Sequence, residues 1–218
     1  MARILAVSDE TNSIAYSGGF KEMKPDLVVA CGDLPFDYLE YLLTTISKPL
    51  LFVPGNHDPD LTPRSQPSTT VNFLAYSERE VPGPEGCTNV DGRILDIAGL
   101  RIAGLGGSHR YREGPNQYTQ KEMAKRCRRL LLRARLRPPR RRRLVDFLIT
   151  HAPPQGVGDD DDLCHQGFES FRKVVELAAP KYLVHGHIHP HGLHASDRQL
   201  GATTVVNAVG YRLLEIQA

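Results

Sequence analysis

Val53-Pro54-Gly55-Asn56-His57-Asp58 is the stretch from which the architecture of the whole chain can be inferred. It follows the apolar run 49–53, which predicts a short buried strand. The Pro-Gly pair ends that strand and forces a tight turn. The turn presents an amide, an imidazole and a carboxylate in succession. An amide oxygen is a hard metal ligand, and a neighbouring histidine handles protons. One such turn carries little weight alone and gains it from similar clusters at other strand ends.

Two earlier segments repeat the design of an apolar strand that ends in a carboxylate. Residues 3–8 lead to Asp9, and residues 26–31 lead through Gly32 to Asp33. Residues 36–46 then place apolar side chains at helical spacing, which predicts a helix that covers the sheet. Strands and helices in alternation indicate an α/β layered fold.

The second half of the chain continues this alternation. It predicts a hairpin over 93–105 with its turn at Ala98-Gly99, a helix that begins with a capping box at Thr119 and Glu122, a strand over 144–150, a helix over 168–177 and a strand over 181–184. No internal repeat is visible, so residues 1–218 are predicted to form a single domain.

Composition places the chain among ordinary globular proteins. Its 218 residues can bury a sizeable core. No apolar run approaches the ~20 residues that a membrane span needs. The chain enters a strand pattern at once, without a visible signal peptide, which predicts a cytoplasmic location. The four cysteines have no CxxC spacing and are expected to be ordinary thiols rather than a disulfide framework or a zinc cluster.

Basic charge is concentrated in one segment. Residues 121–143 hold 12 Lys or Arg and one acid, although the net charge of the chain is +2. Such a segment can neutralise phosphates along a nucleic acid. Its helix also carries an apolar stripe and no interleaved aromatic residues, so a solvated or self-pairing face is favoured. The acidic run 159–162 either attracts a cation or forms a solvated loop that pairs with the chain's own arginines.

Candidate ligands follow five strands: Asp9, Asp33, Asn56, His151, and His187 with His189. In α/β proteins, ligand sites lie at the carboxyl ends of strands. Mixed carboxylate, amide and imidazole donors suit Mn²⁺, Fe or Zn²⁺ better than Ca²⁺. His187 and His189 are two positions apart in an extended segment, so both project from one face and can reach two neighbouring metals.

The ordered set Asp9, Gly32-Asp33, Gly55-Asn56-His57-Asp58, His151 and Gly186-His187-Ile188-His189 resembles the calcineurin-like metallophosphoesterase family over nearly the whole chain. The resemblance implies a four-layer αββα sandwich and a dinuclear metal centre. It also implies a phosphatase or phosphodiesterase that uses a metal-bridging hydroxide.

The same resemblance implies a role for each residue that matches the motifs. Asp33 would bridge both metals. Asn56, His151 and His187 would complete one metal site, and Asp9 and His189 would hold the other. His57 would protonate the leaving group.

The first motif departs from the family pattern of Asp-x-His. Here it reads Asp9-Glu10-Thr11. A threonine hydroxyl is a poor ligand at neutral pH, and Glu10 would have to bend round to help. We expect the metal site at Asp9 and His189 to be weaker than the other, more water-rich, or empty as purified.

Several further residues have two open interpretations. Asp37 either orients His57 or is a helix N-terminal acid favoured by the dipole. His109, Arg110 and Arg112 either hold a substrate phosphate or form a solvated loop. His165 either approaches the pocket or, as we favour, caps a turn or lies at the surface.

Two functions follow from these features. The first is hydrolysis of a small phosphomonoester or phosphodiester. The alternative is a catalytically degenerate protein that binds nucleic acid or another polyanion through residues 121–143. The sequence indicates neither the substrate nor the oligomeric state.

Overall fold

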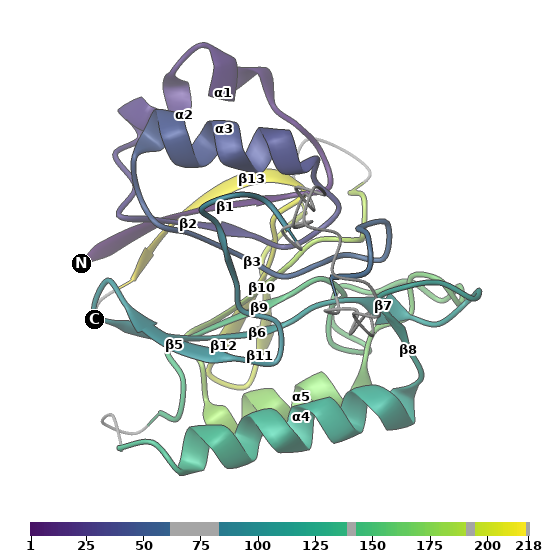
Figure 1. Ribbon diagram of the computed structural model, residues 1–218. Helices are drawn as coiled ribbons and strands as arrows, with labels where there is room; N and C mark the ends of the chain where they lie inside the picture. Colours follow the sequence, from purple (N-terminus) through teal and green to yellow (C-terminus); the bar gives the residue numbers. More distant parts are fainter. Residues whose placement is uncertain (62–82, 139–142, 191–194, 217–218) are drawn as a thin grey trace, which may run out of the picture.

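Two β-sheets pack face to face in the computed structural model, and helices cover the outer face of each sheet (Figure 1). The structure describes residues 1–61, 83–138, 143–190 and 195–216. The layers run helix, sheet, sheet, helix, which confirms the αββα sandwich predicted from the sequence.

The first sheet has the strand order β13-β1-β2-β3-β4. Its strands are β1 (Ala2–Ser8), β2 (Leu27–Ala30), β3 (Leu50–Phe52), β4 (Thr88–Asn89) and β13 (Gly210–Ile216). Strands β1 to β4 are parallel, and β13 pairs antiparallel with β1. Helices α1 (Ser13–Tyr16), α2 (Gly19–Glu22) and α3 (Phe36–Ile46) cover this sheet.

The second sheet has the strand order β11-β12-β10-β9-β6-β5. Its strands are β5 (Ile94–Ile97), β6 (Leu100–Leu105), β9 (Phe147–Thr150), β10 (Tyr182–His185), β11 (Arg198–Leu200) and β12 (Thr203–Asn207). The four inner strands are parallel, and β5 pairs with β6 as the predicted antiparallel hairpin. Helices α4 (Gln120–Arg135) and α5 (Glu169–Ala178) cover its outer face.

Alternation along each strand explains why both faces of each sheet are apolar. In β1, Ile4 and Ala6 pack against the second sheet, whereas Leu5 and Val7 pack against the helices. Successive side chains of a strand point to opposite faces, so a strand covered on both sides is apolar throughout. The core therefore has three parts, one between the sheets and one under each helical layer.

Helix α4 begins where the sequence predicts. The Thr119 side chain accepts a hydrogen bond from the Glu122 backbone N–H, and the Glu122 carboxylate accepts one from the Thr119 backbone N–H. This reciprocal capping box satisfies two backbone donors that a helix start leaves open. The buried stripe of α4, which includes Met123 and Leu130, packs on the second sheet and on α5.

The short pair β7 (Ser108–His109) and β8 (Gln117–Tyr118) projects at one end of the sandwich. The parallel strands of both sheets point their carboxyl ends toward this same end (Figure 1). Within the described residues, no helix has the length and apolar content to cross a bilayer.

Candidate metal centre

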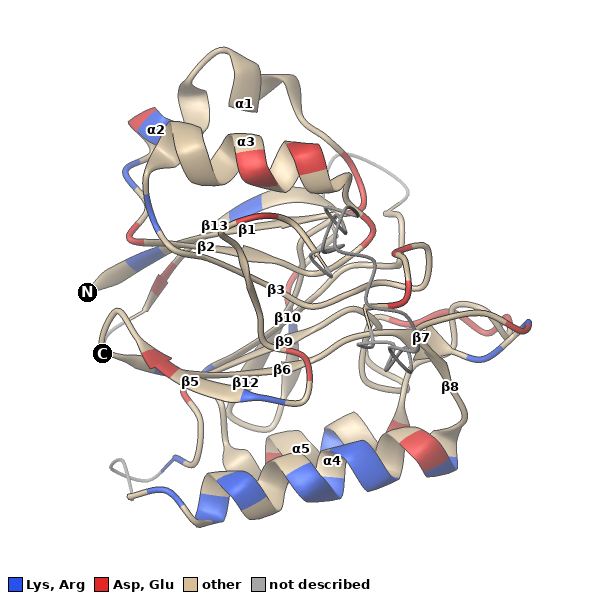
Figure 2. Ribbon diagram, in the orientation of Figure 1, with Lys and Arg blue, Asp and Glu red and all other residues tan. Residues whose placement is uncertain are grey.

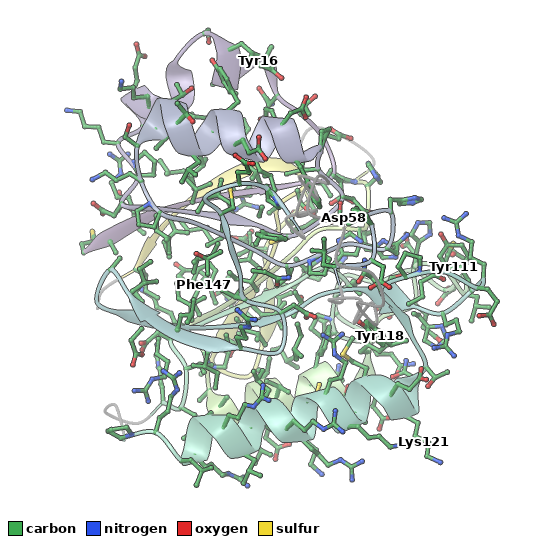
Figure 3. All side chains as sticks on the ribbon, viewed as in Figure 1. Tyr16, Asp58, Tyr111, Tyr118, Lys121 and Phe147 are labelled. Atoms are coloured by element: carbon green, nitrogen blue, oxygen red, sulfur yellow. The ribbon has the colours of Figure 1, made fainter. Side chains whose placement is uncertain are left out.

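A cavity of about 250 Å³ opens at the carboxyl ends of the parallel strands. Its lining residues are Asp9, Asp33, Asn56, His57, Tyr111, Cys164, His165, His187 and His189. Figure 3 places Asp58, next to the Asn56-His57 turn, at the same end of the sandwich as Tyr111. The structure thus brings together residues from distant motifs of the sequence.

The centre of the group is formed by Asp33, His151 and His187. One ligand atom of each lies within 4.8 Å of the others. The His151 side chain is fully buried, and its Nε2 lies 3.3 Å from Asp33 Oδ2 and 2.9 Å from Asn56 Oδ1. Asp33 and Asn56 follow strands of the first sheet, whereas the two histidines follow strands of the second, so the group crosses the seam between the sheets.

Each of the two histidines uses one ring nitrogen to bond a backbone carbonyl. His151 Nδ1 lies 2.7 Å from the Cys31 oxygen, and His187 Nε2 lies 2.7 Å from the Cys164 oxygen. A carbonyl oxygen only accepts, so these nitrogens carry the protons. The opposite nitrogens, Nε2 of His151 and Nδ1 of His187, are the ones that would bind a metal, and at Nε2 of His151 the metal would take the place of a proton that faces the Asp33 and Asn56 oxygens. Metal-binding histidines are usually oriented in this way.

Backbone strain marks three of the candidate ligands. Asp9, Asp33 and His187 have φ angles of 59°, 56° and 68°. Few non-glycine residues adopt this left-handed region, and such residues gather at functional sites. Each of the three directly follows, or closely follows, the end of a parallel strand. All three of these residues line the cavity.

Two glycines allow the carboxylates to approach closely. A Cβ atom on Gly55 would lie 2.0 Å from Asp33 Oδ1, and one on Gly186 would lie 2.2 Å from Asp9 Oδ2. No real contact is so short, so any side chain at either position would displace a candidate ligand. The motif glycines are therefore required by the packing of the centre.

The electrostatics of the group favour a cation. Burial opposes the charged form of His151, but the adjacent Asp33 carboxylate outweighs it and raises the pKa of His151 to about 9. Burial lowers the pKa of His187 to about 3, which keeps that imidazole in the neutral form that binds metals. Burial also raises the pKa of Asp9. A buried carboxylate is stabilised by a nearby positive charge, so the donor set fits a divalent metal.

His189 and Asp9 line the cavity but differ in exposure, because Asp9 is largely buried and His189 is exposed. His189 Nδ1 lies 3.1 Å from Glu10 Oε1, and both side chains are more than half exposed. The Asp9 carboxylate accepts a hydrogen bond from the His187 backbone N–H at 3.0 Å. Glu10 therefore pairs with the candidate ligand His189, although it does not itself line the cavity.

His57 is exposed at the rim of the cavity. Its backbone N–H donates to Asp33 Oδ1 at 2.9 Å. The Asp37 carboxylate accepts a hydrogen bond from the Tyr38 backbone N–H at 2.8 Å, within the first turn of α3. An acid in a helix first turn is drawn to the free amides there, so this contact supports the second of the two interpretations, a helix N-terminal acid.

The predicted phosphate-binding loop contributes a different residue from those expected. Arg110 is held by Glu122 and the Gln117 carbonyl, and the Arg112 guanidinium lies over the Tyr111 ring. His109 packs near Phe168, where burial lowers its pKa. None of His109, Arg110 and Arg112 lines the cavity, whereas Tyr111 does.

Tyr111 is a site residue that the sequence pattern did not reveal. Its hydroxyl accepts a hydrogen bond from Asn56 Nδ2 at 3.4 Å. Its backbone N–H donates to Gln117 Oε1, and that glutamine is almost fully buried. A tyrosine before an arginine in a glycine-rich loop gives no periodic signal, so only the tertiary contacts identify it.

Cys164 and His165 also line the cavity. The His165 ring lies 5.3 Å from the His187 ring, and the Cys164 carbonyl holds His187. His165 is therefore a wall residue, which is the less favoured of its two sequence interpretations.

Helix α4 carries most of the described basic residues of the segment 121–143, and it runs from the end of the sandwich near β8 toward the opposite end (Figure 2). Residues 139–142 of this segment lie outside the described residues. Arg126 pairs with Asp91, Arg133 donates to the Gly92 carbonyl, and Arg137 contacts Asp96. These internal contacts use part of the charge and do not favour the nucleic-acid alternative.

Solved structures share this fold. One covers 98% of this chain and 94% of its own, with a TM-score of 0.63 and 16% identity. The crystal structure of TT1561 of Thermus thermophilus covers 96% of this chain and 89% of its own, with a TM-score of 0.58 and 18% identity. At these identities the likeness establishes the architecture alone. No curated protein matches the sequence.

Two packed sheets with candidate metal ligands at the carboxyl ends of their parallel strands define the class of protein. The family model of the calcineurin-like phosphoesterases matches residues 7–191, which include every candidate ligand named above. The chain therefore belongs to the calcineurin-like phosphoesterase family, as its sequence motifs indicate. Membership supports a hydrolase that acts on phosphoester bonds and uses metal ions.

Proposed function

We propose that this protein hydrolyses a small phosphomonoester or phosphodiester at the cavity between the two sheets. The observation that carries the proposal is the convergence of Asp33, His151 and His187 within 4.8 Å in that cavity. About 250 Å³ is at the small end of ligand sites, which favours a small substrate. The cytoplasmic location stays a prediction from the sequence.

The proposed centre holds two divalent ions, with Mn²⁺, Fe or Zn²⁺ as the expected metals. Asp33, Asn56, His151 and His187 would hold one ion. Asp9 and His189 would hold the other, with Asp33 shared. When bound, such a pair activates water and neutralises charge on the phosphoryl oxygens.

The chain's own residues then orient the reactants and move a proton. The Cys31 and Cys164 carbonyls fix the two ligand histidines, and the Tyr111 hydroxyl accepts a hydrogen bond from the Asn56 amide. The exposed His57 imidazole stands at the rim, where it can donate its proton to the departing oxygen of the substrate. The Asp33 bond to the His57 backbone keeps that turn at the centre.

A titration of the metal-stripped protein with Mn²⁺ tests the proposal. The substrates are an aryl phosphodiester and the matching monoester. We expect Mn²⁺-dependent turnover, lost in Asp33→Asn and kept in Glu176→Gln, an exposed acid on α5. The ratio of diester to monoester rates defines the substrate class. Absence of both Mn²⁺ binding and turnover in the wild-type chain would refute the proposal.

A further inference from the structure

A second group of metal-type side chains lies beside the proposed centre, and two of its three residues, Cys164 and His165, line the cavity. Asp162, Cys164 and His165 each place one ligand atom within 4.8 Å of the other two. We propose that these three residues form an additional site for a thiophilic divalent cation, with Zn²⁺ as the natural occupant. The site would be separate from the two-metal centre.

The donor geometry is close to that of a tetrahedral zinc site. Cys164 Sγ lies 3.6 Å from His165 Nδ1, and the two Asp162 oxygens lie 2.8 Å from these two atoms. Zinc bonds of about 2.0–2.3 Å separate tetrahedral ligands by about 3–4 Å. The thiolate and imidazole already have this spacing. The exposed carboxylate of Asp162 needs only a small outward shift.

The bonding of Asp162 is also informative. Its carboxylate accepts from the Cys164 thiol, the His165 ring and the His165 backbone N–H. Within the described residues, no lysine or arginine pairs with it. The loop thus directs an anion, a thiol and an imidazole at one point without supplying a cation of its own. These are the donors that select Zn²⁺ over Mg²⁺ or Mn²⁺, because thiolate is a soft ligand.

The loop is coupled to the proposed centre. The Cys164 carbonyl accepts a hydrogen bond from His187 Nε2 at 2.7 Å. The His165 ring lies 5.3 Å from the His187 ring and is tilted against it. Cys164 and His165 both line the cavity, and the Asp162 and His165 side chains are partly exposed to solvent. A cation bound by the loop would hold the carbonyl that orients His187 and would fix one wall of the cavity.

A simpler account is that Asp162 only closes a turn of the loop. Its side chain bonds the His165 backbone N–H three residues later, as turn-forming aspartates often do. That account explains one of the three contacts. It requires neither the thiol nor the imidazole to face the same carboxylate, and it predicts no cation binding.

Zinc stoichiometry by equilibrium dialysis separates the two accounts. The probe is Zn²⁺ alone on the full chain after metal stripping. We expect Cys164→Ser to bind one Zn²⁺ fewer per chain than the wild type, while both bind the same number of Mn²⁺. Cys87→Ser is the matched control, because Cys87 is a partly exposed thiol outside the cavity lining. It should match the wild type for both metals.

Cobalt substitution adds a spectroscopic readout. The wild-type and Cys87→Ser proteins should show a thiolate-to-Co²⁺ charge-transfer band, which Cys164→Ser should lack. Equal Zn²⁺ stoichiometry in the three proteins, or no thiolate band in the wild type, would overturn the proposal.

Alkylation of Cys164 can be measured on the wild-type protein, so this test does not depend on whether a variant folds. Zn²⁺ should slow iodoacetamide labelling of Cys164 about tenfold or more, because the alkylated species is the free thiolate. Labelling at an unchanged rate would count against the site. None of these measurements uses turnover. The zinc-site proposal can therefore be refuted while the phosphoesterase proposal is kept, and the phosphoesterase proposal can be refuted while the zinc-site proposal is kept.

Discussion

Oδ1 of Asn56 lies 2.9 Å from Nε2 of His151, although the two residues are 95 positions apart in the chain. Asn56 follows β3 of the first sheet, and His151 follows β9 of the second. The contact therefore crosses the seam of the sandwich. The candidate ligands meet only when both sheets have formed and packed, so metal binding and folding are linked.

This linkage predicts that Mn²⁺ stabilises the fold. A metal at 100 times its Kd adds about 2.7 kcal/mol to the free energy of unfolding, which raises Tm by roughly 5–10 °C for a chain of this size. We expect this shift for the wild type and for Glu176→Gln, and no shift for Asp33→Asn. Differential scanning calorimetry with and without Mn²⁺ measures it. A wild-type Tm that is insensitive to saturating Mn²⁺ would contradict the linkage.

His57→Ala should slow the hydrolysis of esters with poor leaving groups most strongly. Loss of a general acid costs about 10²–10⁴-fold when the departing oxygen needs a proton, and much less for a nitrophenolate, which leaves unprotonated. Metal content should stay near the wild-type level, because the bond from position 57 to Asp33 uses the backbone N–H. Steady-state kinetics on a nitrophenyl and an alkyl ester give the comparison. An equal loss on both esters would exclude the acid role.

Local patterns predicted much of this structure. The hairpin at Ala98-Gly99, the capping box at Thr119 and the strand ends before Asp9 and Asp33 all depend on neighbouring residues. Parallel strands also share one direction, so the order of the motifs was enough to predict that their side chains meet at one edge.

The sequence did not predict the contacts of the loops in the same way. Arg110 donates a hydrogen bond to Glu122. The sequence predicted Glu122 as a capping residue but did not predict this second partner. The Asp37 carboxylate accepts a hydrogen bond from the Tyr38 backbone N–H of its own helix. His165 reaches the cavity because the loop before it is tied to His187, a contact that joins segments 23 positions apart. Such placements depend on tertiary packing and leave no periodic signal.

Tyr111→Phe tests whether the Tyr111 hydroxyl orients the Asn56 amide. The substitution keeps the ring and removes the acceptor of the Asn56 Nδ2 hydrogen bond. The amide can then rotate its oxygen away from the centre. Outer-sphere partners of metal ligands change affinity by about 10–100-fold, and a bond of 3.4 Å places this one near the lower limit.

Isothermal titration with Mn²⁺ measures the affinity directly and does not depend on activity. Tyr16→Phe is the control, because Tyr16 is 61% exposed and does not line the cavity. If both variants bind Mn²⁺ as the wild type does, Tyr111 has no positioning role and serves only as a wall of the cavity.

Thr119→Ala should lower the free energy of unfolding by about 1 kcal/mol, which is the usual contribution of a helix N-cap. Urea unfolding measures the change, and Thr44→Ala is the matched control. Thr44 is exposed inside α3, where alanine is the better helix former, so the control should be neutral or slightly stabilising.

Thr119 is also connected to the loop at the cavity, through Glu122 and Arg110. Glu122 Oε2 accepts from the Thr119 hydroxyl, the Thr119 backbone N–H and Arg110 Nη2. Without the hydroxyl, Glu122 keeps Arg110 through the remaining contacts, so the loop that carries Tyr111 should hold its place. We therefore expect Mn²⁺ affinity to change less than in Tyr111→Phe. A larger loss of affinity in Thr119→Ala would mean that the cap, rather than Gln117, anchors the loop.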